Sequence, residues 1–225
     1  MQDKRKVIER SLSAVAHAFS EFSKNFEREK TVEELLVPFM KSLKDDLGEF
    51  EILYDYIWGK DTLNIDGVTD GDYIPKPGDS VIMDISILKD GVWCDVCRTY
   101  FVGEPSSEQK HMFELIKNSI KAGEKELYSG NLTGNVYRAV NSVFESDGKT
   151  LIHHAGHSIK NAAVDEPRFT DGNTEIIEGG TFYTIETGHY ENFGIRLEND
   201  YFVGEDLCEN LFENLMKLEI EEYIL

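Results

Sequence analysis

The sequence has little positive charge. Its 225 residues contain 23 lysines and arginines against 43 aspartates and glutamates, which gives a formal net charge of -20 at pH 7. This balance argues against a nucleic acid or an anionic membrane as the partner, because both bind basic surfaces. No apolar run is long enough for a transmembrane helix, and the N-terminal residues are too polar for a signal peptide. Since only three cysteines are present, we predict free thiols and a cytoplasmic protein.

A segment with the composition of an interdomain linker is also missing. Hydrophobic residues make up 40% of the chain and charged residues 29%, which is typical of a globular protein with a sizeable core. We therefore predict one domain that spans residues 1–225.

The most informative stretch that is present covers residues 80–103. It predicts two strands joined by an Asp90-Gly91 turn, because a two-residue type I′ turn needs positive φ at both central positions. Side chains alternate along a strand, so pairing about this turn places four of them on one face: Asp84, Ser86, Asp95 and Cys97. Two carboxylates on an otherwise apolar hairpin need a positive partner, since burial of like charges is costly.

The rest of the chain is expected to repeat a helix–helix–hairpin pattern twice. Periodic apolar residues and capping motifs predict four helices, over residues 3–28, 32–48, 107–127 and about 136–148. Further strands are predicted over residues 50–58, 181–187 and 195–203. Residues 151–160 are predicted to form a short strand that runs into a turn, and a polar loop with Pro167 is expected to lead to the second hairpin. The acidic tail from Cys208 onward is expected to hold a last strand and helix.

The second hairpin, folded about Asn192, sets Glu186 opposite Glu198, and His157 lies in the loop before it. The two hairpins and this loop therefore supply five candidate metal ligands: Asp84, Asp95, His157, Glu186 and Glu198. Carboxylate oxygens favour manganese, magnesium or iron, and a single imidazole nitrogen also admits zinc or cobalt. A water molecule would bridge two such ions, and the ions would lower its pKa toward neutrality. Taken singly, each acid could instead be solvated and the histidine merely hydrogen-bonded.

In order and spacing these motifs resemble the pita-bread metallohydrolases, which are the methionine aminopeptidases, prolidases, Xaa-Pro aminopeptidases and creatinase. The motifs are GDSVIMDISILKDGVWCDVCRTYFVG, HHAGHSIK, FYTIETG and GIRLEND, and the resemblance extends from Ser11 to the end of the chain. It implies an α+β pita-bread fold, with pseudo-two-fold helix–helix–hairpin halves around a curved antiparallel sheet. It also implies a catalytic domain without the N-terminal domain that prolidases usually carry.

The resemblance gives each ligand a role. Asp84 would chelate one ion, Asp95 and Glu198 would bridge both ions, and His157 would complete the coordination of the other ion. Glu186 would bind metal and also act as the general acid and base. Arg196 either braces the site through an ion pair or is an ordinary surface-paired strand residue.

The substrate-binding histidines of these peptidases are missing from the matching positions. Asp66 stands near the place of one, in the loop before the first hairpin, and Val164 stands at the place of the other. Three histidines elsewhere could compensate, namely His153, His154 and His189. Of these, His189 follows the Ile-Glu-Thr-Gly motif and is either a substrate contact or an ordinary turn histidine.

The sequence thus predicts a dinuclear hydrolase that uses manganese, cobalt, zinc or iron to cleave the N-terminal amide of short peptides, as an aminopeptidase or Xaa-Pro peptidase does. Its partners would be a short peptide or peptide-like substrate and, in a homodimer, a second copy of the chain. The alternative is a weakly active or inactive pita-bread protein that binds a peptide or a partner protein. The missing histidines favour this alternative, and the complete ligand set disfavours it.

Overall fold

The structure is a computed structural model that describes residues 2–65 and 67–225. Its helical elements are α1 (Gln2–Lys24), α2 (Val32–Leu47), η1 (Gly59–Leu63), α3 (Ser107–Glu124), α4 (Thr133–Ser146) and η2 (Ile220–Tyr223). Its strands are β1 (Glu51–Trp58), β2 (Ser80–Lys89), β3 (Val92–Phe101), β4 (His157–Ile159), β5 (Asp165–Arg168), β6 (Thr181–His189), β7 (Ile195–Val203) and β8 (Cys208–Asn210).

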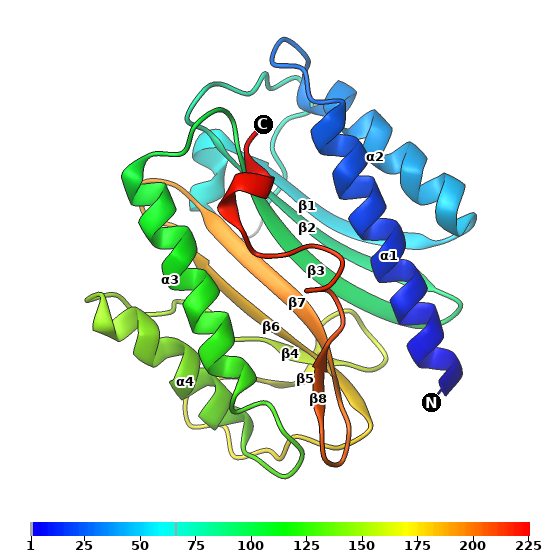
Figure 1. Cartoon of the computed structure of the whole chain (residues 1–225), viewed down its shortest axis with the longest axis vertical. Helices are drawn as coiled ribbons and strands as arrows, with labels where there is room; N and C mark the ends of the chain where they lie inside the picture. Colours follow the sequence, from blue (N-terminus) through cyan, green and yellow to red (C-terminus); the bar gives the residue numbers. More distant parts are fainter. Residues whose placement is uncertain (1, 66) are drawn as a thin grey trace.

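The strands form one antiparallel sheet, in the order β1-β2-β3-β7-β6-β4-β5, with β8 paired to β7 (Figure 1). The hairpins β2–β3 and β6–β7 therefore meet at the centre of the sheet, where Cys97 pairs with Glu198. This junction brings the acids of the first hairpin beside those of the second.

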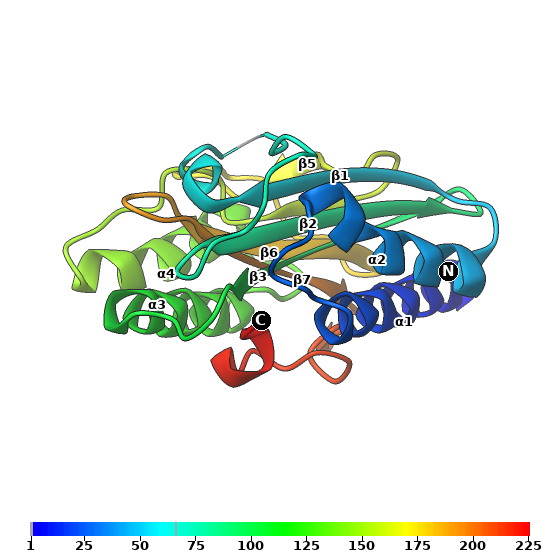
Figure 2. The same cartoon turned by 90° about the horizontal axis from the view of Figure 1, so that it is seen from above.

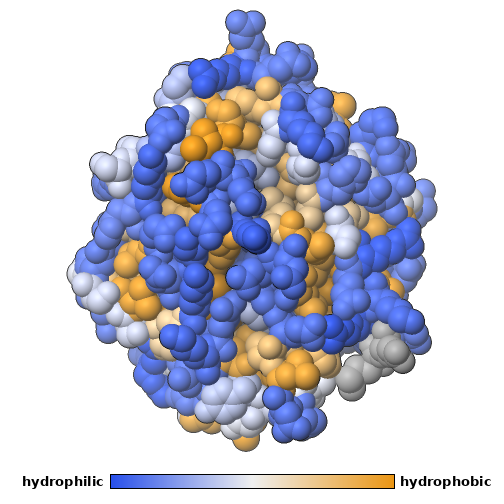
Figure 3. All heavy atoms as spheres, in the orientation of Figure 1, coloured by the Kyte–Doolittle hydropathy of each residue, from blue (hydrophilic) through white to orange (hydrophobic). Residues whose placement is uncertain are grey.

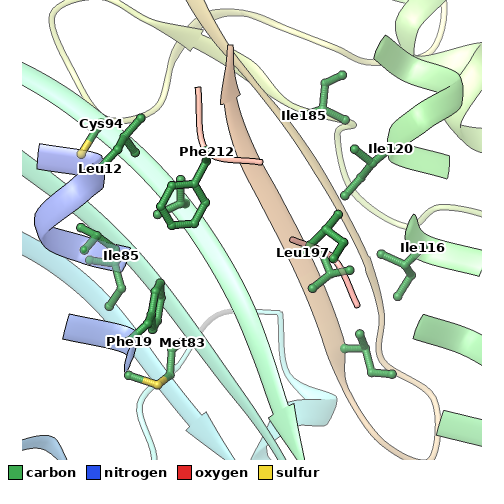
Figure 4. Packing of buried hydrophobic residues seen from close by; sticks show 14 of the residues in the cluster. Leu12, Phe19, Met83, Ile85, Cys94, Ile116, Ile120, Ile185, Leu197 and Phe212 are labelled. Atoms are coloured by element: carbon green, nitrogen blue, oxygen red, sulfur yellow. The ribbon is translucent and has the colours of Figure 1, made fainter. Parts of the chain in front are cut away.

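The four α-helices lie along one face of the sheet, and loops lie over the other face (Figure 2). Apolar side chains of α1 and α3 pack against the helix-facing side chains of the central strands. Figure 4 shows members of this core, among them Leu12, Phe19, Met83, Ile85, Ile116, Ile120, Ile185 and Leu197. Burial of each such side chain contributes about 1.5–3 kcal/mol. The packed face fixes the strands, so the polar side chains on the opposite face are held in place.

The pairing predicted for both hairpins is confirmed. Ser86 pairs with Asp95 and Asp84 with Cys97 in the first hairpin, and Glu186 pairs with Glu198 in the second. The turn of the first hairpin has φ values of 52° at Asp90 and 76° at Gly91, as a type I′ turn requires.

The capped starts predicted for two helices, at Thr31 and at either Ser106 or Ser107, are confirmed as well, with Ser106 as the second cap. The side chain of Thr31 accepts a hydrogen bond from the backbone of Glu34, and Ser106 accepts one from Gln109. In each case the side chain at the third helical position accepts a hydrogen bond from the backbone N–H of the cap residue, so both helices begin with a capping box.

Three predictions near the sheet edge and the tail were wrong. The strand expected over residues 151–160 is only His157–Ile159, because Gly156 has φ +136° and a Cβ on it would lie 2.2 Å from the Thr184 carbonyl oxygen. The expected loop around Pro167 forms β5, where the missing N–H of proline is tolerated because β5 is an edge strand. The last expected helix is the short turn η2.

The surface of the helix side agrees with the acidic composition. Hydrophilic residues cover most of this face, with smaller hydrophobic areas between them (Figure 3). Within the described ranges, the helices are all too short or too polar to cross a membrane.

Candidate metal centre

All five predicted ligands line one cavity of about 340 Å³ on the sheet face away from the helices. Four of them project from the central strands because they occupy alternate positions facing this side: Asp84 on β2, Asp95 on β3, Glu186 on β6 and Glu198 on β7. His157 begins β4, the next strand along. The structure thus brings together residues that are up to 114 positions apart, from Asp84 to Glu198.

Three of these ligands form a buried group. Nε2 of His157 lies 3.5 Å from Glu198 Oε1 and 3.8 Å from Asp95 Oδ2. Candidate ligand atoms of the three residues all lie within 4.8 Å of one another. Nδ1 of His157 donates to the Ser158 carbonyl oxygen at 3.2 Å, which fixes the tautomer and leaves Nε2 able to bind a cation.

The protein's own groups do not fully compensate the burial of the acids in the cavity. Burial, together with the negative charges of neighbouring acids, raises the pKa of Asp95 and of Glu198 well above the usual range. Burial also raises the pKa of Asp84 to about 6, against the lowering effect of Arg196. In the described ranges, Glu198 Oε1 is buried without a hydrogen-bond partner. An oxygen-rich set with one imidazole and an unpartnered buried oxygen fits divalent cations.

Arg196 is a buried part of the site. Its side chain is 4% exposed, and Nη1 donates to Asp84 Oδ2 at 2.7 Å and lies 3.6 Å from Glu186 Oε1. Nη2 donates to the carbonyl oxygen of Ile65. Of the two interpretations left open by the sequence, the ion pair that braces the acids is therefore the observed one.

Glu186 differs from the other acids in its electrostatic surroundings. Burial favours its neutral form, but in the acid range the charges of protonated His153, Arg196 and protonated His154 outweigh burial and lower its pKa to about 2. Its carboxylate is therefore ionised at neutral pH, which is the form that can bind a cation or accept a proton.

The histidines divide between the two faces of the sheet. His153 and His154 line the cavity, and burial lowers the pKa of His154 to about 4, so its imidazole is neutral at pH 7. His189 is not brought to the site. Strand alternation turns it to the helix side, where Nε2 contacts the Glu191 carbonyl oxygen at 3.0 Å and the ring packs on Phe193.

The two positions where substrate histidines were expected have different outcomes. Val164 lines the cavity and is 40% exposed. Asp66 lies outside the described residues.

The cavity also contains residues that the sequence did not single out. Leu53, Tyr54 and Asp55 of β1 form one wall, because β1 pairs with β2 so that Asp55 lies opposite Asp84. An acid in the middle of a largely apolar strand was the signal that the sequence offered. Tyr190 contacts His153, with 3.2 Å between its hydroxyl oxygen and Nε2.

Comparison with known proteins places these features in a family context. A model of metallopeptidase family M24 matches residues 5–205. An Xaa-Pro dipeptidase from Lactobacillus helveticus is 27% identical over 135 residues, which cover 58% of this chain and 37% of that protein. The X-Pro aminopeptidase from Thermotoga maritima MSB8 superposes with a TM-score of 0.91 at 19% identity, covering 100% of this chain and 64% of that one.

A recombinant prolidase from Thermococcus sibiricus gives a TM-score of 0.84 at 25% identity, over 94% of this chain and 59% of that one. These similarities confirm the α+β pita-bread fold. The chain spans little more than a third of the length of the curated dipeptidases that it matches, 36% to 37%.

Proposed function

The chain belongs to metallopeptidase family M24, and from this premise we propose that it is a dinuclear metal-dependent hydrolase that cleaves the N-terminal amide bond of short peptides. One observation carries the proposal. A single cavity gathers the five residues that would hold the metals, and in the described ranges it leaves an oxygen of Glu198 buried without a hydrogen-bond partner.

Two divalent ions would be held by Asp84, Asp95, His157, Glu186 and Glu198. Manganese, cobalt, zinc or iron suits these ligands, since oxygen donors predominate and one imidazole is present. When bound, such ions neutralise the buried acids, polarise the substrate carbonyl and lower the pKa of a coordinated water.

The protein's own groups handle the proton. Glu186, ionised because its pKa is lowered to about 2, accepts a proton from the water that attacks the carbonyl carbon. As the C–O bond forms and the C–N bond breaks, Glu186 returns this proton to the leaving nitrogen. Arg196 holds Asp84 at 2.7 Å and lies 3.6 Å from Glu186, so it fixes both carboxylates relative to each other.

The cavity wall suits the amino end of a short peptide. Leu53, Ile65 and Val164 give it an apolar rim, and the carboxylate of Asp55 adds negative charge beside the ligands. An α-ammonium group would be attracted to this wall, while an apolar side chain would contact the rim. The names of the relatives support peptides with proline in the second position as the first substrates to test.

A second candidate function is the binding of a peptide or partner protein without efficient cleavage. Val164 favours it, because this cavity residue cannot donate the hydrogen bond that the resemblance expects from a histidine there. Loss of a donor that stabilises the reacting carbonyl costs about 10²–10³ in rate in comparable sites.

Metal-reconstituted protein should be tested against a panel of dipeptides and tripeptides with and without proline in the second position. The chelator-treated protein is first loaded separately with manganese, cobalt, zinc or iron, and released amines are measured. We expect turnover with at least one metal and its loss in Glu186→Gln. Metal binding without turnover would favour the binding protein, and failure to bind any of the four metals would refute the proposal.

The single-domain organisation of residues 1–225, the cytoplasmic location and the homodimer remain predictions from the sequence. Size-exclusion chromatography with light scattering would test the homodimer directly.

A further inference from the structure

His154 presents a nitrogen that the chemistry described so far does not use. Its side chain is 19% exposed, but in the part of the chain that the structure describes its Nδ1 atom is buried and has no hydrogen-bond partner. Buried polar atoms without partners are rare in folded proteins, and a bound ion is one accepted reason for them.

The unpartnered nitrogen faces a carboxylate. His154 Nδ1 lies 3.6 Å from Glu186 Oε2, which is too long for a hydrogen bond. Two ligand atoms that bind one zinc ion at about 2.0–2.2 Å lie about 3–3.5 Å apart, so the observed spacing is close to that of two ligands around a cation. A ligand pair explains both the distance and the missing partner.

His153 holds His154 in this place. Nδ1 of His153 donates to the His154 carbonyl oxygen at 2.6 Å, so its Nε2 is left to accept from the Tyr190 hydroxyl at 3.2 Å. Both nitrogens of His153 therefore have protein partners, whereas His154 Nδ1 does not. His153 is therefore a positioning residue, and Nδ1 of His154 is the nitrogen that is free to coordinate a metal ion.

The cavity consequently holds two groups of candidate ligand atoms. Asp95, His157 and Glu198 form one, and Glu186 with His154 and His153 forms the other, each with its atoms within 4.8 Å of one another. The rings of His154 and His157 are 5.5 Å apart between centroids, at 76°, so the two groups lie side by side.

We propose that His154 is a metal ligand through Nδ1, binding the ion at the Glu186 end of the cavity. The centre then has two coordinating imidazoles, one from His157 and one from His154. Imidazole nitrogen shifts a site toward zinc, cobalt and nickel relative to manganese and magnesium. The inference rests on the metal centre of the proposed function, but it does not depend on peptide cleavage.

The test measures metal binding rather than turnover. Chelator-treated wild type, His154→Ala and His154→Gln are titrated with zinc and with manganese by calorimetry, and circular dichroism verifies that each variant is folded. His111→Ala serves as the matched control, because His111 is an exposed histidine of α3 that bonds to Asp147. X-ray absorption of the zinc-loaded proteins counts the coordinated imidazoles.

We expect both His154 variants to bind zinc at least about 10-fold more weakly at one site, since even groups that only orient a ligand contribute 10–100-fold. Manganese affinity should change less, and the imidazole count should fall from two to one for the pair of ions. His111→Ala should match the wild type. Unchanged zinc affinity and an unchanged imidazole count in both folded variants would overturn the inference.

The outcomes separate this inference from the proposed function. Zinc binding that depends on His154, without turnover of any peptide, would support the ligand and refute the hydrolase. Turnover in a protein whose zinc affinity is independent of His154 would support the hydrolase and refute His154 as a ligand. A wild type that binds neither metal would refute both.

Discussion

The two faces of the sheet differ in how far protein groups compensate a buried ionisable side chain. On the helix side, the guanidinium of Arg98 is fully buried and lies 4.5 Å from the centroid of the Phe212 ring. It makes five hydrogen bonds, to the Tyr223 hydroxyl, the Asn199 side chain and three carbonyl oxygens, those of Cys97, Glu198 and Met216. The protein alone thus satisfies every N–H of this cation.

On the cavity side, the protein leaves two buried acids without full compensation: Asp95, three positions from Arg98 on β3, and Glu198 on the neighbouring strand β7. Asp95 and Glu198 are 3% and 2% exposed, and their pKa values are raised by burial and by like charges. A buried charge with all its partners supplied by the chain serves the structure. A buried acid without them is a candidate site for a bound cation.

The strongest test of this contrast is Glu186→Gln on the cavity side. The variant cannot accept the proton of the attacking water, so kcat should fall by about 10²–10⁴-fold if the proposed hydrolysis is correct. The free energy of unfolding should change little, because the amide keeps the shape of the side chain. Peptide assays and guanidinium unfolding would measure the two quantities. A stable variant with wild-type kcat would contradict the role of Glu186.

Arg98→Met on the helix side should show the reverse pattern. It leaves several buried carbonyl oxygens without donors, and we expect a loss of about 3–5 kcal/mol in the free energy of unfolding. Arg138→Met, at an exposed arginine of α4, is the control and should stay within about 0.5 kcal/mol of the wild type. Chemical unfolding of metal-loaded protein measures both. Equal stability of the two variants would contradict the claim that the hydrogen bonds of Arg98 stabilise the fold.

The metal-free protein should be less stable at pH 7.5 than at pH 5. The pKa of Asp84 is raised from 3.8 to about 6, so between these values the folded state holds a proton that the unfolded chain has lost. Stability therefore falls as the pH rises from about 4 through 6, and the change is on the order of 1–3 kcal/mol. Glu186, with its lowered pKa, acts in the opposite sense only below pH 4.5.

Guanidinium unfolding of chelated protein at several pH values would measure this dependence. Glu198→Gln should weaken it, because the substitution removes a second acid whose pKa is raised by burial. Added manganese or zinc should raise stability most at pH 7.5, where the acids are ionised. A chelated protein that is more stable at pH 7.5 than at pH 5 would show that the acids are already compensated.

The smallest effect is expected for His189→Gln. His189 lies on the helix side, and glutamine can still donate to the Glu191 carbonyl oxygen, so kcat/KM should change by less than about twofold. His154→Gln is the matched histidine on the cavity side and should lower zinc affinity. Parallel peptide assays and zinc titrations would compare them. A larger loss of activity in His189→Gln would reassign His189 to the site.

Local rules account for the parts of this protein that the sequence predicted well. Alternation and the Asp90-Gly91 turn set the register of the first hairpin, because both depend on residues close together in the chain. The predicted strand over residues 151–160 was too long, since the close approach of Gly156 to Thr184 is a contact with a distant strand. The predicted strand ended at residue 187, whereas β6 extends to His189. Once His189 belongs to the strand, alternation decides the face to which its side chain points.

By itself, the sequence determined the capped helices, the two acid-bearing hairpins and the identity of the five candidate ligands, because spacing and turn chemistry act over short stretches. Only the tertiary structure decided how Arg196 braces Asp84, which protein atoms surround Arg98, and that His154 faces Glu186. These depend on the meeting of β3 with β7 and on segments about 30 to 125 positions apart. Long-range contacts are set by the packing of the whole core, which no local pattern of residues encodes.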